Sequence, residues 1–208
     1  MANYTITIQR EFGSMGRTIA RKVADRLGIK FYDRDIVEKV SSMLNLPVST
    51  VSNEEENAKC GLIPFIRKFP LGTDDEYMQD MIFSVQRDVI LDLAKKENCI
   101  IVGRCSDAIL EKKPDNLNIY IYAPYKKRLE NCVNYLEMTP QEAKHMIASV
   151  DKARIAYHKK YAGFLPSDEK HHDLMINSAI MDLDYIAEMI VFAAEKKFNI
   201  SEHPEIRI

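Results

Sequence analysis

Apolar positions along the chain follow two periodicities, one typical of strands and one typical of helices. Short apolar or β-branched runs predict five strands, at 4–8, 29–33, 99–102, 117–122 and 173–177. Apolar residues three or four positions apart predict helices between and after them, at 19–27, 35–45, 76–97, 140–161 and 183–196, with a further one starting at Pro124. The run 99–102 is continuously apolar, which predicts a strand buried on both faces.

Alternation of strands and helices predicts the fold class. Such a pattern is typical of an α/β protein, in which helices cross over between parallel strands and cover both faces of the sheet. We therefore expect three layers and a single domain over residues 1–208. Residues 46–75 lose the periodicity and carry three prolines and two glycines, so we interpret them as an excursion from the core.

Composition narrows the class of protein. The chain is 46% hydrophobic and 29% charged, as in ordinary globular domains, and its net charge of −2 argues against binding to a nucleic-acid backbone. The four cysteines show no CxxC spacing, so we expect reduced thiols. We find neither a signal peptide nor an apolar run of membrane-spanning length, and expect a cytoplasmic protein without a membrane partner.

A glycine-containing loop joins the first predicted strand to the first helix, at residues 11–18. Compared with the phosphate-loop pattern GxxxxGK[ST], Gly16 and Thr18 match, whereas Glu11 and Arg17 stand in the first-glycine and lysine positions. A loop that enters a helix N-terminus offers unpaired N–H groups to an anion. An alternative interpretation is a turn whose glycines only permit close strand–helix packing.

Under the phosphate-loop interpretation, each residue type has a role. We expect the loop to bind the ATP phosphates through Gly13, Ser14, Met15, Gly16 and Arg17. Arg17 would supply a fixed cation, although its planar fork differs from a lysine. The hydroxyl of Thr18 is the type of group that contacts Mg²⁺.

The stretch 6–17 resembles the opening of the cytidylate-kinase-like family, whose members carry arginine in the lysine position of the loop. Later stretches resemble the family in the same order along the chain, at 31–35, 100–107, 151–157 and 173–178. The resemblance implies a P-loop NTPase fold and phosphoryl transfer from ATP, with Mg²⁺, to a nucleoside monophosphate such as CMP or dCMP. It further implies that 46–75 binds the acceptor, and that 140–172 forms a helical lid in which Arg154 acts on the transferring phosphoryl group.

Candidate acceptor-binding residues lie near the carboxyl ends of the second and third predicted strands and in the excursion. They are Asp33, Asp35, Arg67, Arg104 and Asp107. Ligands of open α/β sheets bind at that edge of the sheet. Arg104 would hold the acceptor phosphate or form a surface ion pair. Asp33 and Asp35 would hold a hydroxyl or a metal-bound water, Asp33 being the metal candidate, or would simply begin the next helix.

Two other functions stay open at the level of sequence. The stretch 31–35 also resembles the acceptor-binding strand end of shikimate kinases, which points to a small polyol as acceptor. A nucleotide-binding sensor without turnover is the third hypothesis, because the loop lacks its lysine and the lid has few arginines. For the oligomeric state, we expect either a monomer or a homodimer.

Overall fold

The computed structural model describes residues 3–48, 51 and 75–200. Most of the predicted excursion, including Arg67, lies outside this part of the chain. The strands are β1 (Thr5–Arg10), β2 (Lys30–Tyr32), β3 (Cys99–Val102), β4 (Asn116–Tyr122) and β5 (Leu174–Asn177). The helices are α1 (Gly16–Leu27), α2 (Arg34–Leu44), α4 (Asp75–Lys96), α5 (Ser106–Ile109), α6 (Tyr125–Tyr135), α7 (Pro140–Ala162) and α8 (Leu183–Phe198), with a short 3₁₀ turn at Glu169–His171.

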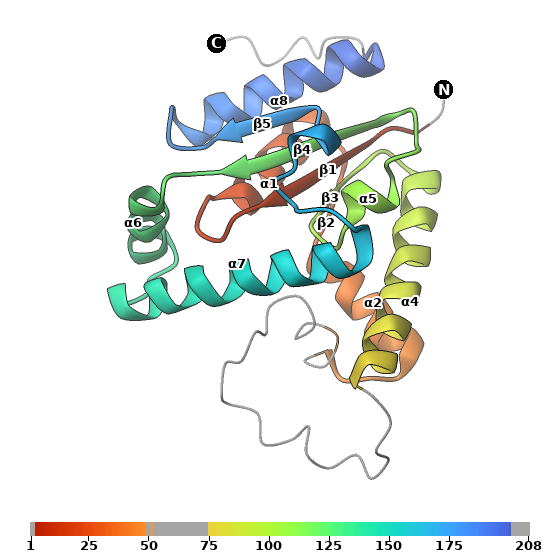
Figure 1. Cartoon of the computed structure of the whole chain (residues 1–208). Helices are drawn as coiled ribbons and strands as arrows, with labels where there is room; N and C mark the ends of the chain where they lie inside the picture. The colour runs from red at the N-terminus through yellow and green to blue at the C-terminus, as the bar shows by residue number, and fades with distance from the viewer. Residues whose placement is uncertain (1–2, 49–50, 52–74, 201–208) are drawn as a thin grey trace.

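All five strands form one parallel sheet in the order β2-β3-β1-β4-β5, and helices lie on both of its faces (Figure 1). The α/β fold with three layers is therefore confirmed. β1 is the central strand, paired with β3 on one side and β4 on the other. Since the strands are parallel, the loops after β1, β2 and β3 leave the same edge of the sheet, where ligands of such folds bind.

The two faces of the sheet carry separate cores because side chains alternate along each strand. On one face Ile6 and Ile8 of β1 pack with the apolar sides of α1 and α8. On the other face Ile101 of β3 packs with α2 and α4. Every residue of β3 is buried, which confirms the strand predicted to be covered on both faces.

Helix ends follow local sequence signals. α1 ends at Leu27, and its C-cap Gly28 has a left-handed backbone (φ 63°) that lets its N–H reach the carbonyls of Ala24 and Asp25. α7 begins with a capping box between Thr139 and Glu142, as predicted. Pro124 precedes α6 as its N-cap, so the prediction that it is the first helical residue is off by one position. The four-residue α5 was not predicted, because one turn is too short to show a period.

Three of the four cysteines lie in the described part of the chain. Cys99, Cys105 and Cys132 are buried free cysteines, and burial raises the pKa of Cys99 to about 12, whereas Cys60 lies outside the described residues. Within the same part of the chain, no helix is long and apolar enough to cross a membrane.

Candidate phosphate-loop site

The loop after β1 leads directly into the N-terminus of α1. Its last residue, Met15, takes a left-handed conformation (φ 61°) and stands at the N-cap without a side-chain cap hydrogen bond. The first turn of α1 holds no acidic residue, and the helix is 12 residues long. The first-turn N–H groups and the positive end of the helix dipole thus favour an anion at this position.

Side chains from elsewhere bind the carbonyl groups of the loop. Asn131 Nδ2 donates to the carbonyl oxygen of Gly13 at 2.9 Å, and Ser178 Oγ donates to that of Ser14 at 2.7 Å. Ser14 itself is fully buried, and its Oγ donates to the carbonyl of Glu11 at 2.9 Å. The side chain of Ser14 therefore supports the loop from inside, and its contribution to ligand binding would come from its backbone.

Two glycines of the loop have no room for a side chain. A Cβ at Gly13 would lie 2.8 Å from the carbonyl oxygen of Arg128 and 2.9 Å from Cys132 Sγ, and Gly13 has φ 77°. A Cβ at Gly16 would lie 2.8 Å from the Cβ of Arg10. Both glycines are thus required by the close approach of neighbouring elements, whatever the loop binds.

We expect Gly13→Ala to lower the free energy of unfolding by about 2 to 3 kcal/mol, because it combines a left-handed backbone with a clash against backbone. Gly28→Ala is the matched control. Gly28 has φ 63° but nothing within 4 Å of its would-be Cβ, so only the backbone cost of about 1 kcal/mol should appear. Urea unfolding of both variants checks this, and equal losses would mean that the clash is relieved.

Arg17, in the lysine position of the loop, forms an ion pair with Asp33. Arg17 Nε lies 2.7 Å from Asp33 Oδ2, and the Arg17 side chain is half exposed whereas Asp33 is buried. Asp33 occupies the N-cap position of α2, but its side chain makes no cap hydrogen bond. The structure thus brings together two candidates that the sequence placed on separate elements. Thr18 and Asp35 lie in the first turns of α1 and α2 and are exposed.

Asp107 at the start of α5 is almost completely buried, and both of its oxygens accept hydrogen bonds. Oδ1 accepts from Gln9 Nε2 at 2.7 Å, and Oδ2 is 2.8 Å from His158 Nε2. Burial, the largest single influence, opposes ionisation, but the hydrogen bonds from His158 and Gln9 and the nearby charge together outweigh it, so the pKa of Asp107 lies below its ordinary value. His158 Nδ1 lies 3.0 Å from the carbonyl oxygen of Phe164, so each ring nitrogen has an oxygen partner. Asp107 therefore links α5 to α7 and to β1.

Arg104 and Arg154 approach the same edge of the sheet from different elements. Arg104 follows β3, is buried, and has a left-handed backbone (φ 62°). Arg154 of α7 donates from Nη1 to the carbonyl oxygen of Arg10, the last residue of β1, at 3.3 Å. Its guanidinium also lies 6.0 Å from the centre of the Phe12 ring. Arg154 is thus placed beside the phosphate loop.

Several side chains that contact the candidate Asp107 or Phe12 of the loop were not singled out from the sequence. They are Gln9, Arg128, Asp151 and His158. Asp151 stands three residues before Arg154, so the two share a face of the helix. This spacing is the one sequence feature that could have identified Asp151 as a neighbour of the site. The others carry no sequence signal, since their partners lie far away along the chain.

A protein-only metal centre is absent from the described residues, where no three His, Cys, Asp or Glu side chains cluster. Magnesium in phosphate-transferring proteins usually takes one or two protein ligands, and phosphate and water oxygens complete its shell. The Thr18 hydroxyl and the Asp33 carboxylate are hard oxygen donors of that kind, so the residues present fit Mg²⁺ bound together with a nucleotide.

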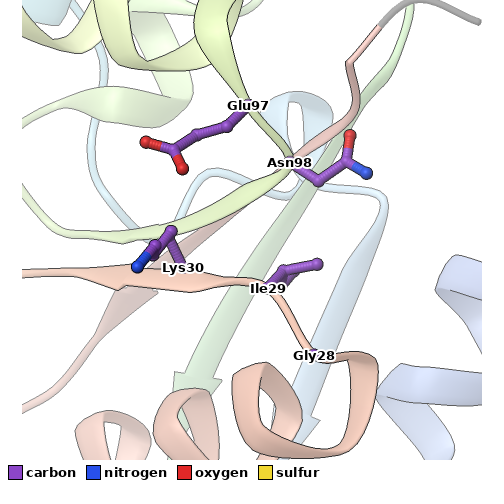
Figure 2. A pocket seen from close by; sticks show the side chains of 5 residues that line it. All are labelled: Gly28, Ile29, Lys30, Glu97 and Asn98. Atoms are coloured by element: carbon purple, nitrogen blue, oxygen red, sulfur yellow. The ribbon is translucent and has the colours of Figure 1, made fainter.

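A pocket of about 390 Å³ lies at the opposite edge of the sheet (Figure 2). It is lined by Gly28, Ile29, Lys30, Glu97 and Asn98, where β2 and β3 begin. Tyr32 donates to Glu97 Oε1 at 2.6 Å beside it. Because the phosphate loop follows the end of β1, this pocket takes no part in the candidate site.

The sheet order and the loop before α1 define the class, a P-loop kinase fold, and solved structures share it. An uncharacterized protein from Eubacterium ventriosum is similar over 93% of this chain and 99% of its own, with 22% identity and a TM-score of 0.69. Shikimate kinase from Acinetobacter baumannii matches at 12% identity, 96% of each chain and a TM-score of 0.51. A gluconokinase from Sinorhizobium meliloti matches at 12% identity and a TM-score of 0.51, over 96% of this chain and 98% of its own.

At these identities the structural likeness concerns the fold alone. No curated protein sequence matches this chain. The model of the cytidylate kinase-like family, however, matches residues 5–180. The chain therefore belongs to the cytidylate kinase-like family, and the family predicted from the loop and the later stretches is confirmed.

Proposed function

We propose that this protein transfers the terminal phosphoryl group of ATP to a nucleoside monophosphate, with CMP or dCMP as the preferred acceptor. The observation that carries the proposal is the uncapped N-terminus of α1, whose first turn holds Arg17 and no acidic residue. In the reaction, an oxygen of the acceptor phosphate bonds to the γ-phosphorus of ATP while the bond to the bridging oxygen breaks and ADP leaves.

The donor side uses the loop and the start of α1. Backbone N–H groups from Gly13 to Arg17 bind the phosphates, and the terminal nitrogens of Arg17 add charge while its Nε stays on Asp33. Thr18 and Asp33 would hold Mg²⁺, which when bound would neutralise charge on the phosphates.

The acceptor side uses the residues that follow β2 and β3. Arg104 would bind the acceptor phosphate and Asp35 a hydroxyl or a bound water, while the buried Asp107 would support this side from within through its contacts with Gln9 and His158. Arg67 stays a prediction of the sequence. Arg154, beside the end of β1, would stabilise the charge on the transferring group.

A coupled ADP-release assay with Mg²⁺ and ATP tests the proposal. The panel contains CMP, dCMP, UMP, AMP, GMP, shikimate and a blank without acceptor. We expect turnover on CMP or dCMP, and a loss of at least about 100-fold in Arg17→Ala, because a fixed cation at the phosphates is removed. Arg21→Ala, one turn along α1 and over Phe31, is the control.

The other outcomes of the panel would support one of the two alternative functions. Turnover on shikimate alone would support the polyol kinase. Binding of ATP by calorimetry without turnover on any acceptor would contradict the kinase and support a nucleotide sensor.

A further inference from the structure

Two side chains hold the peptide group of Phe12, the residue before the first glycine of the loop. Asp151 Oδ1 of α7 accepts the Phe12 N–H at 2.7 Å. Arg128 Nη1 of α6 donates to the Phe12 carbonyl oxygen at 3.2 Å. Both backbone polar groups of Phe12, its N–H and its carbonyl, are thus bound by side chains of α7 and α6. These side chains lie more than 100 positions away in the sequence.

These side chains also bind each other and a neighbour in the loop. Arg128 pairs with Asp151 through Nη1, and its Nε lies 3.4 Å from Glu11 Oε2. Glu11 Oε2 in turn accepts the backbone N–H of Ala123, just after β4, at 3.1 Å. Arg128 and Asp151 are only 11% and 20% exposed, so water screens this network weakly.

The place of Phe12 decides where the next residues lie. Gly13 follows with φ 77°, and its carbonyl is bound by Asn131, also from α6. In Figure 1, α6 lies beyond the end of β4, and α7 runs back from it past the loop that follows β1. The entry to the phosphate loop is therefore held by α6 and α7, which are tied together by the Arg128–Asp151 pair.

We infer that Asp151 is a positioning residue for the donor phosphates, acting through the Phe12 peptide and Arg128. The inference rests on the proposed function, in which ATP binds at this loop. Preorganised N–H groups bind an anion more tightly than groups that must first be ordered, since binding does not have to supply the ordering entropy. The helix that carries Arg154 thus has a second role, because its Asp151 sets the conformation of the loop that binds ATP.

Asp151→Asn is the test variant, because it keeps the shape of the side chain and removes the charge that pairs with Arg128. Asp80→Asn is the matched control. Asp80 of α4 also binds α7, accepting from Tyr161 at 2.9 Å and pairing with Lys160 at 2.9 Å, but it touches no part of the loop. Both variants loosen α7, and only the first reaches the Phe12 peptide.

Calorimetric titration with Mg²⁺ and the non-hydrolysable analogue adenylyl-imidodiphosphate, at a temperature where all proteins are folded, gives the result. We expect Asp151→Asn to weaken binding about 10-fold, as for loss of a charge-assisted hydrogen bond, and Asp80→Asn to bind like the wild type. Arg128→Lys keeps the positive charge but cannot contact Phe12, Asp151 and Glu11 together as the guanidinium does, and it should also weaken binding.

Amide hydrogen exchange gives a readout that needs no variant. In the wild-type protein the Phe12 amide should exchange slowly, because Asp151 accepts its hydrogen. Fast exchange at Phe12, or equal affinities of Asp151→Asn and wild type for the analogue, would overturn the positioning role. A wild type that does not bind the analogue at all would instead overturn the proposed function.

Discussion

Replacing Asp107 with asparagine is expected to lower the free energy of unfolding at pH 7 by about 3 kcal/mol, because it removes a buried carboxylate that is hydrogen-bonded to both Gln9 and His158. The side chains of Asp107 and His158 are 1% and 3% exposed, so water cannot replace the lost partner. Asp92→Asn is the control: Asp92 pairs with Lys96 on the surface of α4, where a loss below about 1 kcal/mol is expected. Urea unfolding measures both.

The pH dependence of that loss follows from the pKa of Asp107. The pKa is lower in the folded protein than the ordinary 3.8, so the carboxylate stabilises the fold fully above that value. Its contribution is lost as the pH falls through the folded-state pKa, and the difference between wild type and variant should shrink below about pH 4. A difference that stays constant down to pH 3 would mean that Asp107 is not the titrating partner.

Replacing Arg154 with alanine is expected to lower kcat about 1,000-fold on the acceptor that turns over, since an arginine that stabilises charge in phosphoryl transfer contributes on that scale. Affinity for the ATP analogue should change much less, because Arg154 acts on the group in transfer and not on the bound nucleotide. Lys152→Ala, an exposed cation two residues earlier on α7, is the control and should stay within a few-fold of wild type.

Steady-state kinetics with both substrates varied separates these effects. Arg154→Lys tests geometry, since it keeps the charge but loses the planar fork, and a partial rate is expected. If Arg154→Ala keeps nearly full kcat and only melts at lower temperature, the arginine serves the hydrogen bond to the carbonyl of Arg10 and has no part in the chemistry.

Much of the fold could be predicted because its signals are local. The five strands follow from short apolar or β-branched runs and the long helices from period 3.6, and their order along the chain implies a parallel sheet. The capping box at Thr139 and the end of α1 at Gly28 depend on residues within one turn, and both are confirmed. Boundaries were less certain, as the start of α6 shows.

The candidate site could be predicted only in part. The sequence placed Arg17 and Asp33 on different elements, and only the fold brings Arg17 Nε to 2.7 Å from Asp33. For Asp107 the sequence suggested contact with the acceptor, whereas the structure surrounds its carboxylate with Gln9 and His158. The roles of these residues in catalysis, like the single domain and its acceptor segment at 46–75, stay predictions for the assays above.

By itself, the sequence determined the class of protein. The features that define the class are local in the sequence: the loop at 11–18, the order of elements and the stretches shared with the family. Only the tertiary structure decided what holds the loop. Asp151 and Arg128 meet Phe12 across separations of 139 and 116 residues, and Asp107 meets His158 across 51. Such contacts depend on how whole helices pack against the sheet, and packing is decided by the sum of buried surfaces and not by any local pattern.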